Sequence, residues 1–237
     1  MQYDAAIIGA GPAGATFARR LAQQSPELKI LQLDAQDEGH KKPCGGLLAP
    51  DAQKTLAHFD LVLPKSVLAD PQIFAVETMD LRTRRVRYYQ RYYLNMDRYA
   101  FDRWLVSLVP PTVEIVRGRC TAVSRTDGGF VLTVRTAEGA RSFTCRCLIG
   151  EAAGFISASS FEGISSAIRS GSALADAFRN VKNTSKITRS YQKKTFSLRC
   201  KLFLKIWKRW FMYTPWVRSL IMRSGIESIR VRRSKED

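Results

Sequence analysis

The sequence has little that would place it within a membrane or send it to a secretory pathway. No apolar run reaches the roughly 18 residues that a membrane-spanning helix requires. The segment Met1–Gly9 has no cationic stretch before its apolar residues, which end at Gly9, so it does not match a secretory signal. We expect a cytoplasmic protein, with association with a membrane surface left open.

Residues that typically bind metals or act in hydrolysis are also scarce. The two histidines, His40 and His58, stand alone, which argues against a zinc site and against a Ser-His-Asp triad. The cysteines are odd in number and lack metal-type spacing: Cys44, Cys120, Cys145, Cys147 and Cys200. Cys145 and Cys147 alternate as along one strand, so we expect reduced thiols and no metal ion.

Acidic residues are few compared with basic ones. The chain has 38 Lys and Arg against 21 Asp and Glu, a net charge of +17, and residues 151–237 alone contain 18 basic and 6 acidic residues. Such a balance favours anionic partners, either nucleic acid or lipid headgroups. No nucleic-acid-binding motif accompanies the charge, so nucleic acid is the less favoured partner.

What the chain does contain is a globular composition and a glycine motif near its start. The length, 237 residues with 45% hydrophobic residues, allows one large domain or a domain with part of a second. An apolar strand at 4–8 leads into Gly9-Ala10-Gly11-Pro12-Ala13-Gly14 and then a small-residue helix at 15–24. Glycines at these positions allow a tight turn, close approach of a pyrophosphate, and close helix packing.

The residues that follow the motif support dinucleotide binding. A second strand at 29–33 ends at Asp34, 20 residues after Gly14, where a ribose-binding acid is expected. The alternative is a glycine-rich turn with no ligand. The motif itself does not separate FAD from NAD.

The middle of the chain predicts strands around a helix. A helix at 97–105 precedes a strand at 113–116, and strands at 120–125, 129–136 and 141–149 are separated by turns at Asp127-Gly128 and Glu138-Gly139. We therefore expect an α/β fold in which a three-stranded antiparallel meander interrupts a parallel, Rossmann-like sheet.

Two further motifs give a resemblance to a known family. Lys42-Pro43-Cys44-Gly45-Gly46-Leu47-Leu48 resembles the Cys-Gly-Gly loop of the geranylgeranyl reductase family, and Gly150-Glu151-Ala152-Ala153-Gly154 resembles the late glycine motif of its para-hydroxybenzoate-hydroxylase-like FAD-binding fold. The resemblance covers most of residues 1–180 and implies FAD as cofactor. It implies cofactor contacts at Gly9, Gly11, Pro12, Ala13, Gly14, Asp34, Arg103, Gly150, Glu151, Gly154 and Gly163.

Individual roles follow from the same resemblance. Arg103 matches a helical arginine that reaches the cofactor; the alternative is a solvated arginine on an amphipathic helix. Glu151 stands where the family usually has an aspartate, and either carboxylate can accept a hydroxyl hydrogen bond. The loop Cys44-Gly45-Gly46 would line the catalytic site. Cys44 would assist proton transfer there, or be an inert apolar residue.

The segment after Glu151 predicts a helix. Ser159 and Ser160 are suited to cap it, and apolar residues from Ile164 to Phe178 follow helical spacing. The free N–H groups at its start would suit a flavin ring that gains negative charge. An ordinary buried helix is the alternative.

The junction at 148–150 indicates an internal deletion. In the resembling family, the end of the meander and the late glycine motif belong to different strands, whereas here Leu148-Ile149-Gly150 serves both. The comparison implies that about a hundred residues, the scale of a sub-domain, are missing. We therefore expect an FAD-binding domain at 1–60 and 97–181 and a remnant of a substrate domain at 61–96, whose strands at 74–79 and 85–89 would lack partners.

The remaining residues, 182–237, predict a basic helical tail. On a helix over 199–211, basic residues gather on one side and aromatic and aliphatic residues on the other. Such a helix suits a membrane interface, which would serve a lipid-like substrate. The alternative is that the aromatic side packs on the FAD-binding domain.

Two functional hypotheses stay open. One is an FAD-dependent oxidoreductase that reduces double bonds of a prenyl or other apolar substrate with hydride from the reduced flavin, as the resemblance implies. The other is a truncated, non-catalytic remnant that binds FAD weakly or not at all and associates with a membrane surface.

Overall fold

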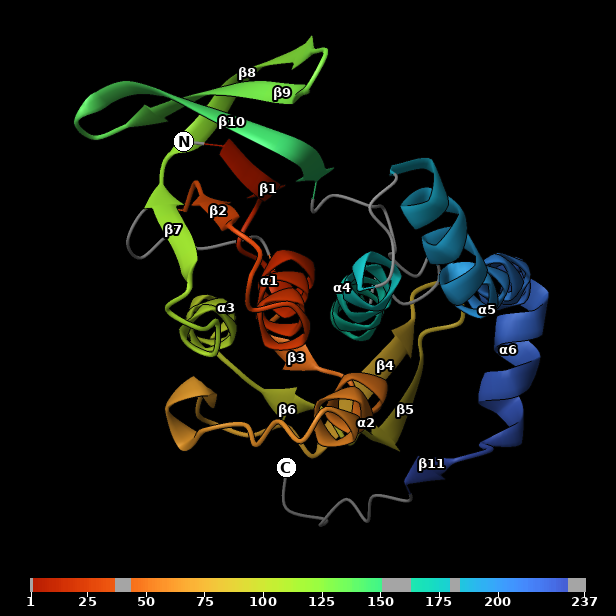
Figure 1. Ribbon diagram of the computed structural model, residues 1–237. Coiled ribbons are helices and arrows are strands. Elements are labelled where there is room, and N and C mark those ends of the chain that lie inside the picture. Colours follow the sequence, from red (N-terminus) through yellow and green to blue (C-terminus); the bar gives the residue numbers. More distant parts are fainter. Residues whose placement is uncertain (1, 37–43, 151–162, 180–183, 230–237) are drawn as a thin grey trace.

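The computed structural model describes residues 2–36, 44–150, 163–179 and 184–229 (Figure 1). Its strands are β1 (Gln2–Ile8), β2 (Ile30–Asp34), β3 (Leu47–Leu48), β4 (Ala75–Asp80), β5 (Arg85–Gln90), β6 (Leu94–Asn95), β7 (Val113–Arg117), β8 (Arg119–Thr126), β9 (Gly129–Thr136), β10 (Gly139–Gly150) and β11 (Ser228–Ile229). Its helices are α1 (Pro12–Gln24), α2 (Pro50–His58), α3 (Arg98–Ser107), α4 (Ile164–Phe178), α5 (Thr184–Tyr213) and α6 (Pro215–Ser224), with a short 3-10 turn, η1 (Lys65–Val67).

A six-stranded sheet of order β7-β2-β1-β10-β9-β8 forms the centre of the fold. The pairs β7–β2, β2–β1 and β1–β10 are parallel, while β10–β9 and β9–β8 are antiparallel. The expected α/β fold is thereby confirmed, including the meander that extends from the parallel strands (Figure 1).

The strand β10 shows how Leu148-Ile149-Gly150 can serve as the end of the meander and as part of the parallel sheet. Its first half pairs with β9, from Gly139 opposite Thr136 to Cys145 opposite Phe130. Its second half pairs with β1, from Thr144 opposite Gln2 to Gly150 opposite Ile8. One strand of 12 residues therefore ends the meander and also forms part of the parallel sheet.

Two hydrophobic clusters lie on the two faces of this sheet. Ala5 and Ile7 belong to the larger cluster, with Phe17 of α1 and Ile168 of α4, whereas Ala6 on the other face packs in a smaller cluster with residues of β2 and the meander. The alternation of neighbouring residues between faces is the geometry of a strand that is buried on both sides. In Figure 1, α1 and α4 lie side by side against the larger cluster's face.

The strands expected to lack partners are paired, which corrects that prediction. β4 pairs with β5 in an antiparallel hairpin, and β11 from the tail adds to β5. Three polar contacts support the same docking: Arg218 of α6 forms an ion pair of 3.0 Å with Asp80, Arg87 Nε donates to the carbonyl of Met222, and Arg85 Nη1 donates to the carbonyl of Ser219. The tail therefore covers part of the edge of β5 that would otherwise be exposed. This matters because the unpaired N–H and C=O groups of an edge strand can pair with other chains.

Other predicted boundaries differ in detail. The helix expected after Glu151 begins at Ile164 with Gly163 as its N-cap, so a serine cap at 159 or 160 is wrong for this helix; both serines lie outside the described residues. The tail helix is longer than the expected 199–211. The domain boundaries stay a prediction, and Val67 and Met96 belong to the same core cluster as Ile7 and Phe17.

Candidate functional site

The turn between β1 and α1 is built by a very close backbone contact. A Cβ atom added to Gly14 would lie 2.3 Å from the carbonyl oxygen of Gly9, so only glycine fits there. Gly9 itself has a φ of +122°, and its N–H donates to the carbonyl of Leu33 at 3.0 Å. The first turn of α1 has Pro12 and no side-chain cap, and the regular hydrogen bonds of a helix supply no carbonyl acceptor for first-turn N–H groups such as those of Ala13 and Gly14. This geometry suits an anion at the start of α1.

Gln32, a residue that the sequence patterns did not single out, holds this turn through a hydrogen bond to its backbone. It is fully buried in β2, and its Nε2 donates to the carbonyl of Gly9 at 3.1 Å. Its Oε1 is buried with no hydrogen-bond partner among the described residues. The available signal was one amide side chain in an otherwise apolar strand.

The acid at the end of β2 forms an ion pair with the helical arginine. Asp34 Oδ2 accepts from Arg103 Nη1 at 2.5 Å, although 69 positions separate the two residues. Gln36 joins both, since its N–H donates to Asp34 Oδ1 at 3.1 Å and its Oε1 accepts from Arg103 Nη2 at 2.9 Å. The Asp34 side chain is 1% exposed and that of Arg103 is 21% exposed, so the alternative of a solvated arginine is wrong.

Local structure holds Arg103 in this position. Helix α3 begins where the Asp97 side chain accepts from the N–H of Ala100 at 2.9 Å, a standard N-cap. One turn earlier on α3, Arg98 forms an ion pair of 3.0 Å with the fully buried Asp102. The Nε of Arg103 has no partner among the described residues. Asp34 and Arg103 thus form an ion pair beside the glycine turn. The carboxylate oxygens of Asp34 each accept one hydrogen bond and could accept another from a ligand.

Helix α4 packs directly on the first turn of α1. A Cβ added to Gly171 would lie 2.4 Å from the carbonyl oxygen of Ala13, so this glycine too is required by a close approach. Farther along the two helices, Asp176 accepts from Arg20 at 3.2 Å and from Gln24 at 2.8 Å. Burial raises the pKa of Asp176, but these two partners outweigh it and hold that pKa below its ordinary value. The contact fixes α4 against the glycine turn.

The late glycine motif is described only in part. Gly150 ends β10 opposite Ile8, so it lies at the same edge of the sheet as the turn that starts at Gly9. Glu151 and Gly154 lie outside the described residues. Gly163 is the N-cap of α4 and has no side-chain cap hydrogen bond.

The Cys-Gly-Gly loop has a structural reason for one of its glycines. Gly46 has a φ of +67°, and a Cβ there would lie 2.7 Å from the carbonyl oxygen of Met96. Gly45 has open space around it. Cys44 is exposed, and its Sγ lies 3.9 Å from Nη1 of Arg98. The loop leads through β3 to α2, whose Thr55 is hydrogen-bonded to Ser165 of α4 at 3.0 Å.

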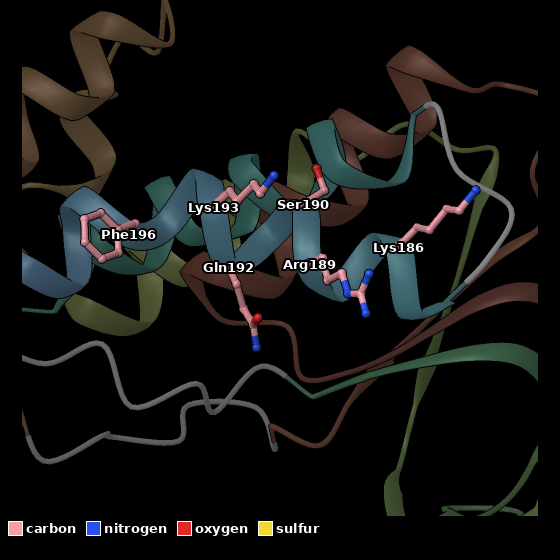
Figure 2. Close-up of a pocket in the computed structure, with 6 residues that line it drawn as sticks. All are labelled: Lys186, Arg189, Ser190, Gln192, Lys193 and Phe196. Carbon is pink, nitrogen blue, oxygen red and sulfur yellow. The ribbon is translucent and has the colours of Figure 1, made fainter.

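The predicted cofactor residues do not line the hollow shown in Figure 2, which measures about 720 Å³. Its described lining comes from α5 alone: Lys186, Arg189, Ser190, Gln192, Lys193 and Phe196. The glycine turn and this basic hollow are therefore built from different residues and form separate features of the surface.

The described part of the chain has neither a cluster of metal ligands nor a membrane-spanning helix. Within the described ranges, no three His, Cys, Asp or Glu side chains gather as a metal site would require. None of the helices in the described part of the chain has the length and hydropathy needed to cross a bilayer.

Comparison with curated proteins decides the family. Protein CbrA of Shigella sonnei (strain Ss046) is 31% identical over 353 residues, covering 96% of this chain and 98% of that protein. The chain belongs to the CbrA family. Protein CbrA of Shigella dysenteriae serotype 1 (strain Sd197) is 43% identical over 153 residues, a match that spans 62% of this chain and 42% of that protein. No family model matches the sequence.

The longer alignment bears on the predicted deletion. Since 96% of 237 residues is about 228, about 125 of the 353 aligned positions have no counterpart in this chain. The alignment covers nearly all of both proteins, so these positions lie within it. This supports a CbrA-type chain that lacks an internal segment; its position near Gly150 stays a prediction.

Solved structures share the fold at low identity. The flavin-dependent brominase Bmp2 triple mutant superposes with a TM-score of 0.52 and 17% identity, over 63% of this chain and 38% of that chain. The p-nitrophenol 4-monooxygenase PnpA from Pseudomonas putida DLL-E4 gives a TM-score of 0.50 and 13% identity, over 63% and 40%. The similarity shows that this CbrA-family chain shares its fold with these two proteins. The resemblance to geranylgeranyl reductases stays a prediction.

Proposed function

We propose that this CbrA-family chain binds FAD and acts as an FAD-dependent oxidoreductase. The observation that carries the proposal is the combination of the Gly9–Gly14 turn with the Asp34–Arg103 ion pair at one edge of a parallel sheet. Ligands of such sheets bind outside the carboxyl ends of the strands, which is where both features lie. The fold shared with the brominase and the monooxygenase supports a flavin over other dinucleotides.

The residues present fit the cofactor. Only glycine is accommodated at Gly14, and the uncapped start of α1 offers N–H groups to a pyrophosphate. Asp34 has spare lone pairs for ribose hydroxyls, because each of its oxygens accepts one hydrogen bond from Gln36 or Arg103. Further contacts proposed for FAD involve Gly11, Pro12, Ala13, Gly150, Glu151, Gly154 and Gly163.

The chain's own side chains would then do three things. The Gly9–Gly14 turn would bind the pyrophosphate, and Asp34 would orient the ribose while Arg103 holds its carboxylate in place. Cys44, Gly45 and Gly46 would line the reacting side and help to exclude water there. Bound FAD supplies two-electron transfer to or from a substrate. The proposed substrate is a prenyl or other apolar lipid-like molecule whose double bonds are reduced.

A second candidate function has specific support. The gap of about 125 aligned positions and the double use of β10 favour a shortened chain in which the substrate-binding part is reduced. Such a chain would be a non-catalytic remnant that binds FAD weakly or not at all.

One experiment separates the two. The purified protein is incubated with excess FAD and passed through a desalting column, and bound flavin is quantified by absorbance before and after anaerobic dithionite addition. One flavin per chain that bleaches and recovers in air supports the oxidoreductase, and prenyl lipids are then tested for uptake of a hydrogen pair. A colourless protein supports the remnant.

A matched pair of variants ties bound flavin to the proposed site. Asp34→Asn removes the charge beside Arg103, whereas Asp127→Asn makes the same change at an exposed position in the β8–β9 turn. We expect at least a tenfold loss of FAD affinity for the first and none for the second, because a hydrogen bond to a charged group contributes about 1.5–3 kcal/mol. Equal affinity of both variants would contradict the assignment.

A further inference from the structure

Exposed apolar side chains concentrate in the tail of this protein. Among the described residues, 18 large hydrophobic side chains are exposed, and 11 of them lie between positions 196 and 229. Phe203 is 61% exposed, Trp207 64% and Trp216 71%. A concentration of exposed apolar side chains in one part of a protein is typical of an interaction site rather than of an ordinary surface.

Helix α5 presents its apolar side to solvent and packs with the opposite side. At 100° per residue, positions 196, 203 and 207 fall within about 40° of arc. Ile187 and Thr195, which are buried, lie on the other side of the helix. The alternative in which the aromatic side packs on the FAD-binding domain is therefore wrong for the described side chains.

Basic residues continue this exposed side toward the start of α5. Lys186, Arg189 and Lys193 line the hollow in Figure 2 together with Phe196, and all three cations are exposed. Helix α5 contains nine Lys and Arg and no Asp or Glu. The same side of one helix is thus cationic in its first half and aromatic farther on.

Helix α6 adds to the apolar surface. It contacts α5 and lies beside it in Figure 1. Trp216 and Leu220, four positions apart and therefore on one side of the helix, are both exposed. The buried Met222 and the ion pair of Arg218 with Asp80 hold α6 against the β4–β5 hairpin, so the surface is held on a folded support.

We propose that the exposed sides of α5 and α6 form a docking surface for an anionic lipid bilayer, called here the tail surface. It consists of Lys186, Arg189, Lys193, Phe196, Phe203, Trp207, Trp216 and Leu220. Charge complementarity selects this occupant, because phosphate headgroups and acyl chains together match a surface that is cationic and aromatic. A second copy of the chain would bring a repulsive charge of the same sign.

The geometry fits a helix that lies in the plane of the interface. Trp and Phe side chains prefer the boundary between headgroups and acyl chains, while Lys and Arg extend their charged ends toward the phosphates. Binding should therefore depend on both the aromatic side chains and the salt concentration. The proposal does not depend on flavin binding.

Co-sedimentation with vesicles tests this docking in the full chain. Vesicles of phosphatidylglycerol and phosphatidylethanolamine are compared with pure phosphatidylcholine, at low salt and at high salt. We expect binding to the anionic vesicles only, with a large loss at high salt. Vesicles with brominated acyl chains should quench the fluorescence of Trp207 and Trp216. A Trp207→Phe/Trp210→Phe/Trp216→Phe variant retains Trp104, which is partly buried and packs against the larger core cluster, and should show no quenching.

Two pairs of variants identify the residues responsible. Phe203→Ser/Trp207→Ser should weaken binding at least about tenfold, whereas Phe74→Ser, at a site that is 77% exposed outside the tail, should have no effect. Replacing Lys186, Arg189 and Lys193 by Gln should also weaken binding at least about tenfold, since each cation near an anionic membrane surface contributes to the free energy of binding. Replacing the exposed Arg119, Arg125 and Arg135 of the meander by Gln removes the same charge and should leave binding unchanged.

Several outcomes would overturn the proposal. They are no binding to anionic vesicles, equal binding of the tail and control variants, or binding to DNA without binding to vesicles. A dimer detected by light scattering that is lost in Phe203→Ser/Trp207→Ser, with no vesicle binding by the unsubstituted protein, would assign the surface to a second copy instead.

Discussion

Replacing Gly14 by Ala tests the close contact on which the glycine turn depends. The added Cβ would lie 2.3 Å from the carbonyl oxygen of Gly9, whereas ordinary contacts begin at 3.4 Å, so the helix and the turn must separate by about 1 Å. The carbonyl cannot rotate away easily, because Gln32 Nε2 donates to it. Such overpacking costs about 1–3 kcal/mol, and the gain in helix propensity of Ala over Gly offsets up to about 1 kcal/mol.

Because the added Cβ would lie only 2.3 Å from a backbone atom, the overpacking cost should be near the upper end of its range, which leaves a net loss of stability of about 2 kcal/mol for Gly14→Ala. For a chain of this size, that corresponds to a fall in Tm of about 4–8 °C, measured by differential scanning calorimetry. Gly128→Ala, in the exposed β8–β9 turn, is the control, because the nearest atom to its added Cβ is Nε2 of the Gln2 side chain at 4.0 Å, and its Tm should change by less than about 2 °C. An unchanged Tm in Gly14→Ala would refute the close approach of α1 to the turn. FAD affinity, measured on the same samples, should fall only in Gly14→Ala.

Three further changes test other parts of the structure. Arg103→Met leaves the carboxylate of Asp34 buried without its cation, so urea unfolding should show a loss of about 2–4 kcal/mol; an unchanged midpoint would contradict the ion pair. For Asp80, burial raises the pKa but hydrogen bonds and the Arg218 guanidinium outweigh it and keep the pKa below its ordinary value, so this contribution is complete above about pH 4 and is lost as pH falls through the lowered pKa; in Arg218→Met, the acid-induced part of the unfolding should be smaller. Burial, followed by the nearby thiols, raises the pKa of Cys145 to about 11, so iodoacetamide at pH 8 should label it only after denaturation, as checked by peptide mass spectrometry.

Local sequence patterns were sufficient for the elements that carry the glycine turn. The strand, turn and helix at 4–24 are specified by residues close to one another, and the meander is specified by alternation and by turns such as Asp127-Gly128. The ion pair between Asp34 and Arg103 was not predicted, because no local rule connects positions so far apart and the family resemblance assigned each residue only to the cofactor. The hydrogen bond from Gln32 to the carbonyl of Gly9 was missed for a similar reason, because 23 positions separate these two residues.

The tail was harder to predict because its structure depends on distant partners. The helical pattern of α5 is local, but which side packs depends on what the rest of the chain offers. The pairing of β11 with β5 joins Ser228 to Tyr89, and a strand of two residues carries almost no sequence signal. The serine cap was placed too early because serines at 159 and 160 resemble a cap more than Gly163 does.

The double role of β10 also has a consequence for synthesis on the ribosome. β1 emerges before β10, so its partner on one side becomes available only when Leu148, which pairs with Ala6, has been made. At about 5–20 residues per second, that delay is on the order of 10 s. During that time one edge of β1 has no strand to pair with. The side chains of β1 that later pack into the two hydrophobic clusters are then incompletely covered. Because β10 also pairs with β9, this one strand joins the parallel strands to the meander. The six-stranded sheet can therefore form completely only after β10 has been synthesised.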